Sequence, residues 1–511
     1  MPEMLLKRWQ KQEPRLVDAV TKIAERVAGC PPNKKFKNTP PRALLVGGCV
    51  RDLMLDLKPK DADVEIFGVT PDEVERLTVE LFGKHVDAVG KSFGVLKVFL
   101  GDGYEIDVTL PRRESKAGWG HRGFKIASDP GLSLEDAARR RDFTFNAISL
   151  DPLTGELIDP FNGQDDLKDR LLRVVDAKHF PEDPLRVYRA VQFAARFNGE
   201  IDPASFKLMR KMVERGDLEE LSKERVGGEI KKLLLKAPKP SVGFELAREL
   251  DVIGKYYPEL AIMKQTPQEP DWHPEGDVWI HTLMVVDEAA KIIRRDEKIF
   301  NEEEKLQLML GALCHDLGKP STTAPGEKKG IPRIRSLGHE AAGGIPTQTL
   351  LDKWAFGERA EHAAVTIATE HMHPLNFYFM LQRGVITEEQ YANTVRKLIR
   401  RIQPLNWRVF LAACEADHRG RGFEGLDTDP YEIGKTFAAA VKKHELDIEA
   451  KKTLVQGRDI LDLAAKLGVD VKPGPQFGEL ISQIEALRDE GTIKTREEGL
   501  EKLKELLGQC E

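Results

Sequence analysis

The sequence predicts an α+β protein in which a small domain with a mixed sheet precedes mostly helical regions. Two observations support this prediction. Between Ala43 and about Leu150, short apolar runs typical of strands alternate with stretches typical of helices. Beyond Asp165, almost every segment has the helical period of apolar residues. The chain has 511 residues, too many for one ordinary core, so we expect three or four domains.

Composition narrows the class of protein. Charged residues make up 32% of the chain and the net charge is −6, which is typical of a soluble protein. No apolar run approaches the roughly 20 residues that a bilayer span needs, and the N-terminal residues lack the apolar segment of a signal peptide. The five cysteines are scattered without a CxxC pair, which indicates reduced thiols. We therefore expect a cytoplasmic protein with no membrane partner. Local basic stretches at 111–125, 201–240 and 394–421 leave room for RNA contacts despite the acidic total.

The run LLVGGCVRD predicts a strand, a tight turn and a helix. Gly47 and Gly48 allow backbone N–H groups to approach a phosphate, and a following helix N-terminus favours an anion. Arg51 lies in the first turn of the expected helix, from which its guanidinium could reach a triphosphate. Taken alone, two glycines after a strand are also typical of an ordinary turn.

Two acids follow in the run KDADVEIFG. Asp61 and Asp63 are two residues apart on an expected strand, so both project from one face. Carboxylate oxygens suit Mg²⁺, which commonly bridges protein carboxylates and substrate phosphates. A two-metal site needs a third acid, and Asp107 in YEIDVTL is the candidate because it alternates with apolar residues on an expected strand. The alternative at each position is an acid on a solvent-facing strand.

Two further segments combine acids with arginines. In RRRDFTFNAI, Arg141 could contact a phosphate or a ribose, and Asp142 lies four residues before Asn146. The alternative is a helix with a charged start and an apolar core face. In FPEDPLRVYRAVQF, Asp183 and Arg186 are three residues apart at a helix start and are therefore neighbours. Such a pair could present acceptors and donors to the edge of a base, or could be an ordinary ion pair.

The order of these motifs resembles one known family. GGxVRD, KDxD, RRDFTxNA, DPFxGxxDL and EDPLR follow one another, over about 44–197, as they do in the class II tRNA nucleotidyltransferase and poly(A) polymerase family, within the polymerase-β-like nucleotidyltransferase superfamily. The resemblance implies a polymerase-β-like head domain with a two-metal site at Asp61 and Asp63.

The same resemblance assigns contacts to the nucleotide. The residues that match such contacts are Gly47, Gly48, Arg51, Arg141, Asp142 and Arg189. The resemblance also implies an amino-acid template at Glu182–Arg186, where Asp183 and Arg186 would pair with the incoming C or A. Gln192 departs from the pattern, since some members carry an arginine there, which puts that contact in doubt. A flexible loop is implied at about 112–124.

Finer details of the sequence resemble members that mature tRNA. The phrases KDADVEIFGVTPDEVERL and PRRESK are closer to these members than to poly(A) polymerases. The resemblance therefore implies addition of CCA to the 3′ end of tRNA from CTP and ATP, with Mg²⁺ and without a nucleic-acid template. The alternatives are an A-adding enzyme, a CC-adding enzyme or a poly(A) polymerase. The sequence leaves the oligomeric state open.

A second candidate metal site lies downstream. Adjacent His and Asp residues at the end of an apolar helix, with a distant His and Asp, can surround a metal with nitrogen and oxygen ligands. The residues in question are His281, His315, Asp316 and Asp417. The phrases CHDLGKP and EADHRGR resemble the HD phosphohydrolase superfamily and the bacterial CCA enzymes that carry HD domains. His339 and either His371 or His373 could complete the site.

This second resemblance implies a metal-dependent phosphatase and 2′,3′-cyclic phosphodiesterase that uses a divalent ion such as Ni²⁺ or Mn²⁺. The alternatives are a purely structural domain that holds tRNA and an RNA-end-repair hydrolase in which this site is the main activity.

The expected domains are an N-terminal helical extension and linker (1–41), a head (42–151), a helical neck with the nucleotide template (152–250), an HD domain (251–425) and a helical tail (426–511). Residues 1–30 are expected to form one amphipathic helix.

Overall fold

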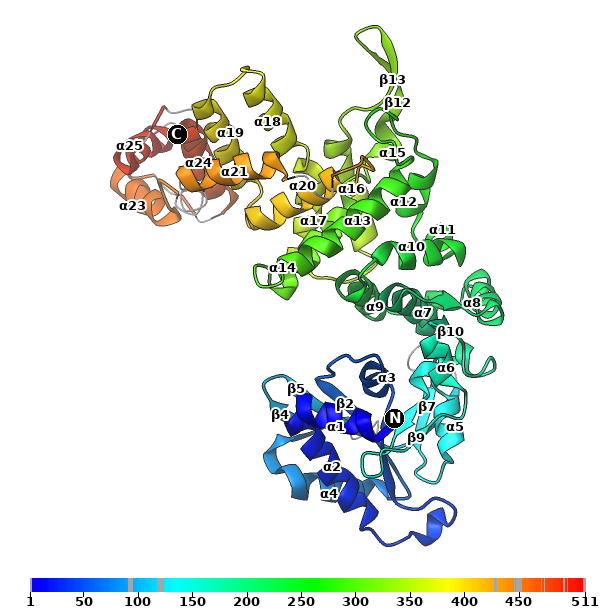
Figure 1. The fold of residues 1–511 in the computed structure, drawn as a ribbon. Helices are drawn as coiled ribbons and strands as arrows, with labels where there is room; N and C mark the ends of the chain where they lie inside the picture. Colours follow the sequence, from blue (N-terminus) through cyan, green and yellow to red (C-terminus); the bar gives the residue numbers. More distant parts are fainter. Residues whose placement is uncertain are drawn as a thin grey trace. The chain divides into compact units, whose positions relative to one another are not determined.

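A computed structural model of the chain gives the fold (Figure 1). It describes residues 2–90, 95–116, 124–426, 430–444, 446, 453–469, 471–472, 474–489, 492–493 and 495–508. The chain forms two compact units, Met1–Pro258 and Glu259–Glu511. The first contains a mixed sheet and the second is mostly helical, so the predicted α+β class is confirmed.

The sheet of the first unit has seven strands in the order β3-β4-β5-β2-β1-β8-β9. Strand β2 is parallel to β5 and antiparallel to β1, and the other pairs in this sheet are antiparallel. The strands are β1 (Arg42–Val46), β2 (Asp61–Phe67), β3 (Val86–Gly90), β4 (Val95–Gly101), β5 (Tyr104–Thr109), β8 (Ser149–Leu150) and β9 (Leu157–Ile158). A separate hairpin joins β6 (Arg112–Lys116) to β7 (Phe124–Ser128). Residues 117–123 of the loop expected at 112–124 lie outside the described residues.

The N-terminal segment forms two helices instead of the single helix expected. Helix α1 spans Pro2–Gln12 and α2 spans Pro14–Ala28. The break falls at Glu13 because Pro14 lacks an N–H and disfavours helical backbone in the residue before it. Apolar residues of α2 join the core formed by one face of the sheet, where α2 packs against β1 and against α4 (Pro71–Phe82), which lies beside it (Figure 1).

The other face of the sheet carries the polar residues, and the chain then continues into helices. Helix α3 (Gly48–Met54) directly follows β1. The later elements of this unit are α5 (Leu134–Arg139), η5 (Thr144–Asn146), α6 (Gly163–Lys168), η6 (Phe180–Glu182), α7 (Leu185–Phe197), α8 (Pro203–Arg215), α9 (Lys223–Lys236), α10 (Pro240–Glu249) and α11 (Val252–Tyr256). Helix α7 packs against both α9 and α10.

In the second unit, four helices pack against one another: α13 (Val278–Arg295), α14 (Glu302–Cys314), α17 (Glu358–Glu370) and α20 (Trp407–Arg419). Helix α16 (His339–Leu351) packs against α17, and α15 (Lys319–Thr322) packs against α16. The short helix α12 (Pro258–Ala261) precedes α13 in the chain, and α18 (His373–Gln382), α19 (Glu388–Arg401) and α21 (Glu432–Lys443) pack against one another. A hairpin of β12 (Thr323–Lys328) and β13 (Ile331–Ser336), which the sequence did not predict, follows α15.

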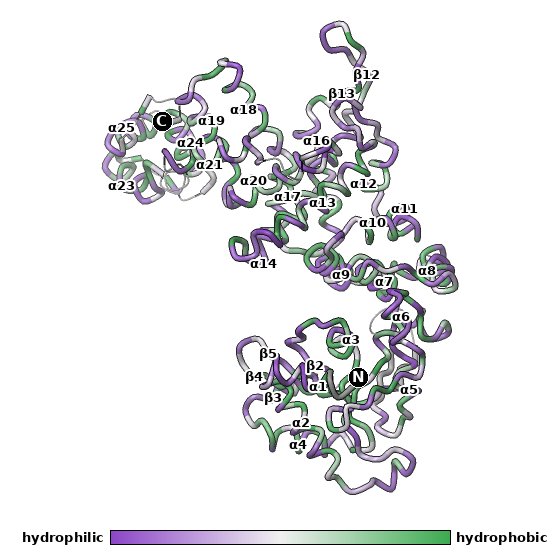
Figure 2. The backbone as a smooth tube through the Cα atoms, viewed as in Figure 1, coloured by the Kyte–Doolittle hydropathy of each residue, from purple (hydrophilic) through white to green (hydrophobic). Residues whose placement is uncertain are grey.

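The C-terminal helices have a small core of their own. They are α23 (Gly457–Leu467), α24 (Pro475–Asp489) and α25 (Arg496–Leu507), and their buried apolar side chains form a separate cluster. Polar and apolar residues are mixed along the helices of both units (Figure 2). Among the described residues, no helix is both long and apolar enough to cross a bilayer.

Candidate functional site

The first candidate site is a patch of carboxylates on the polar face of the sheet. Asp61 and Asp63 alternate along β2 with residues buried in the core. In the parallel pairing of β2 with β5, Asp63 lies opposite Asp107 and Asp61 lies opposite Glu105. Neighbouring strands are about 4.8 Å apart, so four acidic side chains stand together on two adjacent strands. The structure thus brings together the three acids that the sequence singled out.

The carboxylates raise one another's affinity for protons. Burial raises the pKa of Asp63, and the neighbouring Asp107 and Asp61 raise it further against the opposing effect of Arg141. Burial also raises the pKa of Asp61, followed by the charge of Glu105. Lys97 on β4, which the sequence did not single out, partly offsets this charge, because its Nζ lies 2.8 Å from Asp107 Oδ1. A patch of this kind is suited to cations.

The glycine turn holds an arginine beside the patch. Gly47 has φ +72°, a backbone conformation that non-glycine residues rarely adopt. A Cβ atom at this position would lie 2.9 Å from Arg141 Nη1 and 3.4 Å from Asp63 Oδ2. Gly47 therefore lets the Arg141 guanidinium lie directly over the turn, near the acids of β2. Arg141 also lies 3.7 Å from Glu65 of the same strand.

Arg51 has protein partners in this structure. Only 3% of the residue is exposed, and its guanidinium lies over the rings of Phe193 and Phe197 of α7, 5.1 and 4.9 Å from their centroids. It donates to Asn146 Oδ1 at 2.7 Å and to Asp52 Oδ1 at 2.6 Å. Arg51 thus ties α3 to α7, and its predicted contact with a triphosphate stays a prediction.

The RRDFTxNA motif forms a buried joint between the sheet domain and α7, with the short helix η5 in place of a longer helix. Asp142 Oδ1 accepts hydrogen bonds from Asn146 Nδ2 at 2.9 Å and from the Phe143 N–H at 2.8 Å. Its Oδ2 accepts from Arg189 Nε of α7 at 2.7 Å. Burial alone would raise the pKa of Asp142, but the charge of Arg189 and the hydrogen bonds hold it below its ordinary value.

Asp183 and Arg186 have separate partners. Both oxygens of Asp183 accept from Arg225 Nη2 of α9 at 3.0 Å. Arg186 donates to the carbonyl oxygens of His179 at 2.8 Å and Arg140 at 2.7 Å. The two side chains therefore do not form the ion pair that their spacing allows. Arg225 was missed because it lies some forty residues further along the chain. Gln192, where the sequence departs from the family pattern, is buried in α7.

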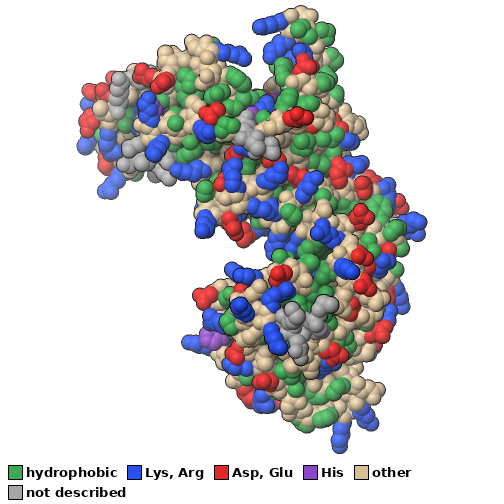
Figure 3. Space-filling view, viewed as in Figure 1, with side chains coloured by type: hydrophobic (Ala, Val, Ile, Leu, Met, Phe, Trp, Pro, Cys, Tyr) green, Lys and Arg blue, Asp and Glu red, His purple; other side chains and the backbone are tan. Residues whose placement is uncertain are grey.

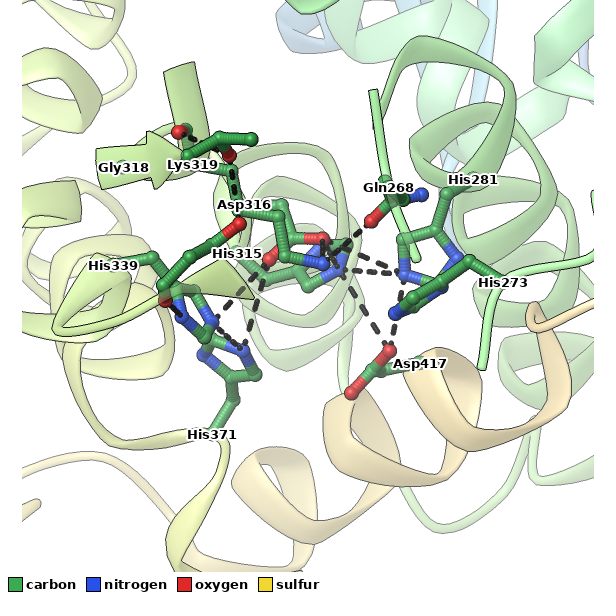
Figure 4. Close-up of polar contacts among 12 residues, drawn as sticks. Gln268, His273, His281, His315, Asp316, Gly318, Lys319, His339, His371 and Asp417 are labelled. Carbon is green, nitrogen blue, oxygen red and sulfur yellow. Dashed lines mark hydrogen bonds and ion pairs between the residues drawn. The ribbon is translucent and has the colours of Figure 1, made fainter. Parts of the chain in front are cut away.

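The second candidate site is a buried cluster in the helical unit. Its side chains come from five different helices or their ends and point toward one another (Figure 4). The residues are His281 on α13, His315 and Asp316 after α14, His339 at the start of α16, His371 after α17 and Asp417 on α20. His373, the alternative to His371, pairs instead with Glu370 at 3.1 Å. The structure therefore brings the four predicted ligands together with His339 and with His371, one of the two alternatives that the sequence left open.

Asp316 lies at the centre of this cluster. Its Oδ2 lies 3.2 Å from His315 Nε2 and 3.6 Å from His281 Nε2. Its Oδ1 lies 3.6 Å from His339 Nε2 and 4.0 Å from His371 Nε2. Each carboxylate oxygen thus faces a different pair of histidines. Asp417 Oδ1 lies 3.2 Å from His281 Nε2, on the side of the first pair.

The hydrogen bonds of the histidine Nδ1 atoms, which point away from Asp316, determine whether the Nε2 atoms that face it can bind a metal. Nδ1 of His315, His339 and His371 lies 2.8–3.0 Å from the carbonyl oxygens of Ala312, Ser336 and Ala368. A carbonyl oxygen only accepts, so in the neutral ring Nδ1 carries the hydrogen and Nε2 has a free lone pair. Two such Nε2 atoms, of His339 and His371, are only 3.4 Å apart. Facing lone pairs repel unless a cation lies between them, and this orientation by a second partner is typical of metal ligands.

At His371 the surroundings favour the same neutral state, whereas at His281 burial acts against the carboxylates Asp417 and Glu275, which raise the pKa of this ring to about 9. Burial lowers the pKa of His371 to about 4, with His315 acting in the same direction, so this imidazole is neutral. Burial alone would raise the pKa of Asp316, but His315 and Lys319 hold it well below its usual range. Lys319 and Glu275, which the sequence analysis missed, lie 2.7 Å from Asp316 Oδ2 and 2.8 Å from His281 Nδ1. Two groups with metal-ligand spacing share Asp316, His281–His315–Asp316 and Asp316–His339–His371, and a third, His273–Glu275–His281, adjoins them through His281.

Comparison with known proteins agrees with this arrangement. Three family models match the chain: Poly A polymerase head domain over residues 43–173, Probable RNA and SrmB-binding site of polymerase A over 199–263, and HD domain over 278–405. The Multifunctional CCA protein of Actinobacillus pleuropneumoniae is 34% identical over 410 residues, which cover 80% of this chain and 92% of that protein. The chain belongs to the family of multifunctional CCA proteins. The CCA-family member of Pasteurella multocida is 35% identical over 413 residues, covering 79% and 90% of the two chains.

Solved structures share the fold of this CCA-family chain. The Bacillus stearothermophilus CCA-adding enzyme in complex with CTP matches 98% of this chain and 100% of its own, with a TM-score of 0.58 and 20% identity. The Thermotoga maritima CCA-adding enzyme complexed with tRNA matches 99% and 98%, with a TM-score of 0.53 and 19% identity. As in the family, the chain is a nucleotidyltransferase with an HD domain.

Proposed function

We propose that the head domain adds the 3′-terminal CCA to tRNA from CTP and ATP, without a nucleic-acid template. The observation that carries the proposal is the carboxylate patch on β2 and β5, where Asp63 and Asp107 are register partners. Membership in the CCA family supports the choice of CTP, ATP and a tRNA end as substrates. It also disfavours a poly(A) polymerase.

The reaction joins the RNA 3′-oxygen to the α-phosphorus of the nucleotide. The bond from that phosphorus to the pyrophosphate oxygen breaks, pyrophosphate leaves, and the proton of the 3′-hydroxyl passes to solvent. Asp61, Asp63 and Asp107 would hold two Mg²⁺ ions, which supply charge at the attacking and leaving oxygens. Arg141, held over the Gly47 turn, would bind the phosphates.

Selection of the base falls to the start of α7. Asp183 presents acceptors and Arg186 presents donors, and each is already fixed by protein partners, Arg225 and backbone carbonyls respectively. Fixed donors and acceptors discriminate bases well, because a mismatched base leaves them without partners. We assign the remaining matched residues, Gly48, Arg51, Asp142 and Arg189, to nucleotide contact or to support of this template.

The test is extension of a tRNA transcript that lacks CCA, with the added nucleotides counted and identified. Wild-type protein is expected to add C, C and A and then stop. The Asp61→Ala variant should add no nucleotide. The His315→Ala variant, changed in the HD cluster and not in the head, should add all three nucleotides. Extension by A only, by CC only or by a long run of A would overturn the assignment in favour of the corresponding narrower enzyme.

We further propose that the HD domain is a metal-dependent phosphohydrolase acting on phosphoesters such as 2′,3′-cyclic phosphates. The observation that favours it is the convergence of four histidine Nε2 atoms on the two oxygens of Asp316. Nitrogen and oxygen ligands together suit divalent transition metals such as Ni²⁺ or Mn²⁺. The two ligand groups that have Asp316 in common would hold the ions.

In this reaction, a water oxygen forms a bond to phosphorus, one ester P–O bond breaks and the leaving oxygen gains a proton. The bound ions would supply Lewis acidity at the phosphoryl group. Lys319, 2.7 Å from Asp316 Oδ2 and bonded to Gln268, holds the central carboxylate in place. Hydrolysis of bis-p-nitrophenyl phosphate with added Mn²⁺, lost in His315→Ala and kept in Asp61→Ala, tests the proposal. Absence of hydrolysis with each metal tried would leave a structural HD domain.

A further inference from the structure

A cavity opens directly onto the HD cluster. Its volume is about 860 Å³, within the range of pockets that enclose a ligand of several tens of atoms. Asp316, His339, His371 and Asp417 lie on its wall, together with residues of α18, of the β12–β13 hairpin and of the segment before α13. This space is far larger than a single phosphate group needs, so the remainder of the ligand must be recognised by the other walls.

Those walls carry large apolar side chains that face solvent. Trp272 is 39% exposed and Phe379 is 44% exposed, and both line the cavity. Leu337 and Val385, 65% and 64% exposed, line it as well. Apolar groups that gather around a cavity with convergent polar groups are typical of a ligand site. Exposed aromatic rings in particular offer flat surfaces on which a base can stack.

Cations accompany these rings. Lys328 of the hairpin lies 4.5 Å above the Trp272 ring, and Arg383 lies 5.5 Å above the Phe379 ring. Arg335 and Arg421 also line the cavity, and Lys and Arg side chains are visible along the hairpin in Figure 3. The acid Glu269 on the same wall is already bound by Arg333. Glu340 is a further acid on this wall, but beyond the metal ligands the cations of the described wall outnumber its acids.

We propose that this cavity binds the last nucleotides of a single-stranded RNA end, with bases stacking on Trp272 and Phe379 and the terminal phosphate at the HD cluster. The inference rests on the proposed hydrolase and specifies its substrate. Stacking on aromatic rings, together with a groove that is positive along the backbone, is how proteins bind single strands without reading sequence. Lys328 and Arg383 lie over these rings, and they would move from the ring faces to backbone phosphates when bases stack there.

A free nucleotide shares the chemistry of a base next to a phosphate, but the cavity favours a longer ligand. The cations come from separate elements, the β12–β13 hairpin, the residue directly after α18 and the segment after α20. A mononucleotide bound at the metal cluster presents one phosphate, which cannot contact cations on all of these elements at once. An RNA end supplies one phosphate for each further nucleotide.

The first experiment compares two substrates of the full-length protein assayed with Mn²⁺. One is an RNA hexanucleotide ending in a 2′,3′-cyclic phosphate, and the other is bis-p-nitrophenyl phosphate, which has no base. Trp272→Ala and Phe379→Ala are each expected to lower the ratio of kcat/KM for the RNA to that for the ester by about tenfold, as loss of one stacked base implies. Phe423→Ala, an aromatic of similar exposure that does not line the cavity, should leave the ratio unchanged.

The outcomes separate this inference from the proposed hydrolase. If the ester is hydrolysed but neither variant changes the ratio, the inference fails while the hydrolase stands. If wild-type protein hydrolyses neither substrate, the hydrolase itself fails. A third arm uses 2′,3′-cyclic UMP: a KM equal to that of the hexanucleotide would identify a free nucleotide as the ligand and overturn the RNA assignment.

A second readout does not depend on catalysis. A hexanucleotide with 5-iodouracil at its 3′-terminal position is irradiated on the full-length protein, and crosslinked peptides are identified by mass spectrometry. Adducts are expected on the peptides that contain Trp272 or Phe379, and excess unlabelled hexanucleotide should remove them. Adducts only on peptides of the first unit would contradict the proposal.

Discussion

The head and the HD domain both gather acids for phosphate chemistry, but they do so in opposite ways. In the head, three aspartates lie on two neighbouring strands of one sheet, and Lys97 and Arg141 lie among them. In the HD domain, the ligands come from five helices, and backbone carbonyls fix their rings. The head offers a charged surface that substrate and ions complete, whereas the HD cluster is organised in advance.

The largest effect should separate the two sites completely. Asp63→Asn keeps the shape of the side chain but removes its negative charge and thus one of the proposed carboxylate ligands. CCA addition is therefore expected to fall by at least about a thousandfold, as loss of a metal-centred step implies. Hydrolysis by the HD domain should be unaffected. His315→Ala should give the reverse pattern, measured by tRNA extension and ester hydrolysis on the same preparations.

Glu105→Gln is the matched control for the head, since Glu105 lies on the same face of β5 next to Asp61 but is not one of the proposed ligands. A loss below about tenfold is expected, because only a neighbouring charge changes. Equal losses in Asp63→Asn and Glu105→Gln would mean that the patch acts through its total charge and that the assignment of separate ligands is wrong.

The joint between the head and α7 should contribute strongly to stability. Arg189→Ala leaves Asp142 buried without its cation, which should lower the free energy of unfolding of the first unit by about 3 kcal/mol. The folded-state pKa of Asp142 is lowered, so the stabilisation is present above the unfolded value near pH 4 and is lost as pH falls through the folded value. The gap between wild type and variant should therefore be widest at neutral pH.

Hydrogen exchange of peptides from β1, β2 and α7 measures this effect within the first unit alone. Lys22→Ala, which removes an exposed i,i+4 pair with Asp18 on α2, is the control and should change protection by no more than about 0.5 kcal/mol. A gap between wild type and Arg189→Ala that widens on acidification would contradict the sign of the Asp142 shift.

Metal retention should distinguish the head, whose site is completed by substrate and ions, from the HD cluster, whose ligands are organised in advance. Glu275 orients His281 from outside the ligand set, at 2.8 Å from Nδ1, so Glu275→Ala is expected to weaken metal binding by the HD domain by about 10–100-fold. Elemental analysis after gel filtration should find bound metal in wild type and less in this variant. Asp61→Asn should not change the content, because the head is expected to take its ions with the nucleotide. Equal metal loss in both variants would mean that the head also retains metal without nucleotide, which contradicts the proposed difference between the two sites.

The same contrast explains what the sequence could predict. Asp61, Asp63 and Asp107 were found because acids at a spacing of two stand out on short apolar strands. Lys97 was missed because a lysine on a strand is common and only the register with Asp107 gives it meaning. The β2–β5 pairing itself is a crossover between distant segments, which local patterns do not encode.

The HD cluster was predicted only in part for the same reason. His315-Asp316 is a local signal, but His371 and His373 are indistinguishable by spacing and differ only in which one reaches the cluster. The β12–β13 hairpin was missed because Pro325, Gly326 and Pro332 interrupt any strand pattern. At the other end of the chain, Pro14 divides the expected single helix, a signal that was present in the sequence.

The smallest effect concerns base selection, where the helical neck that follows the head has a preorganised element like that of the HD domain. Arg225 holds Asp183 through both carboxylate oxygens, so Arg225→Ala should release the side chain while leaving the carboxylates of β2 and β5 intact. We expect the preference for the correct nucleotide at each step to fall by about tenfold, the order of one hydrogen bond to a charged group, with a smaller change in the rate of correct addition. Arg225→Lys should restore part of the preference, because it returns the charge without the paired donors. Misincorporation is counted by sequencing extended tRNA. Equal loss of rate and fidelity in Arg225→Ala would mean that Arg225 supports the fold of α7 and α9 and does not position Asp183.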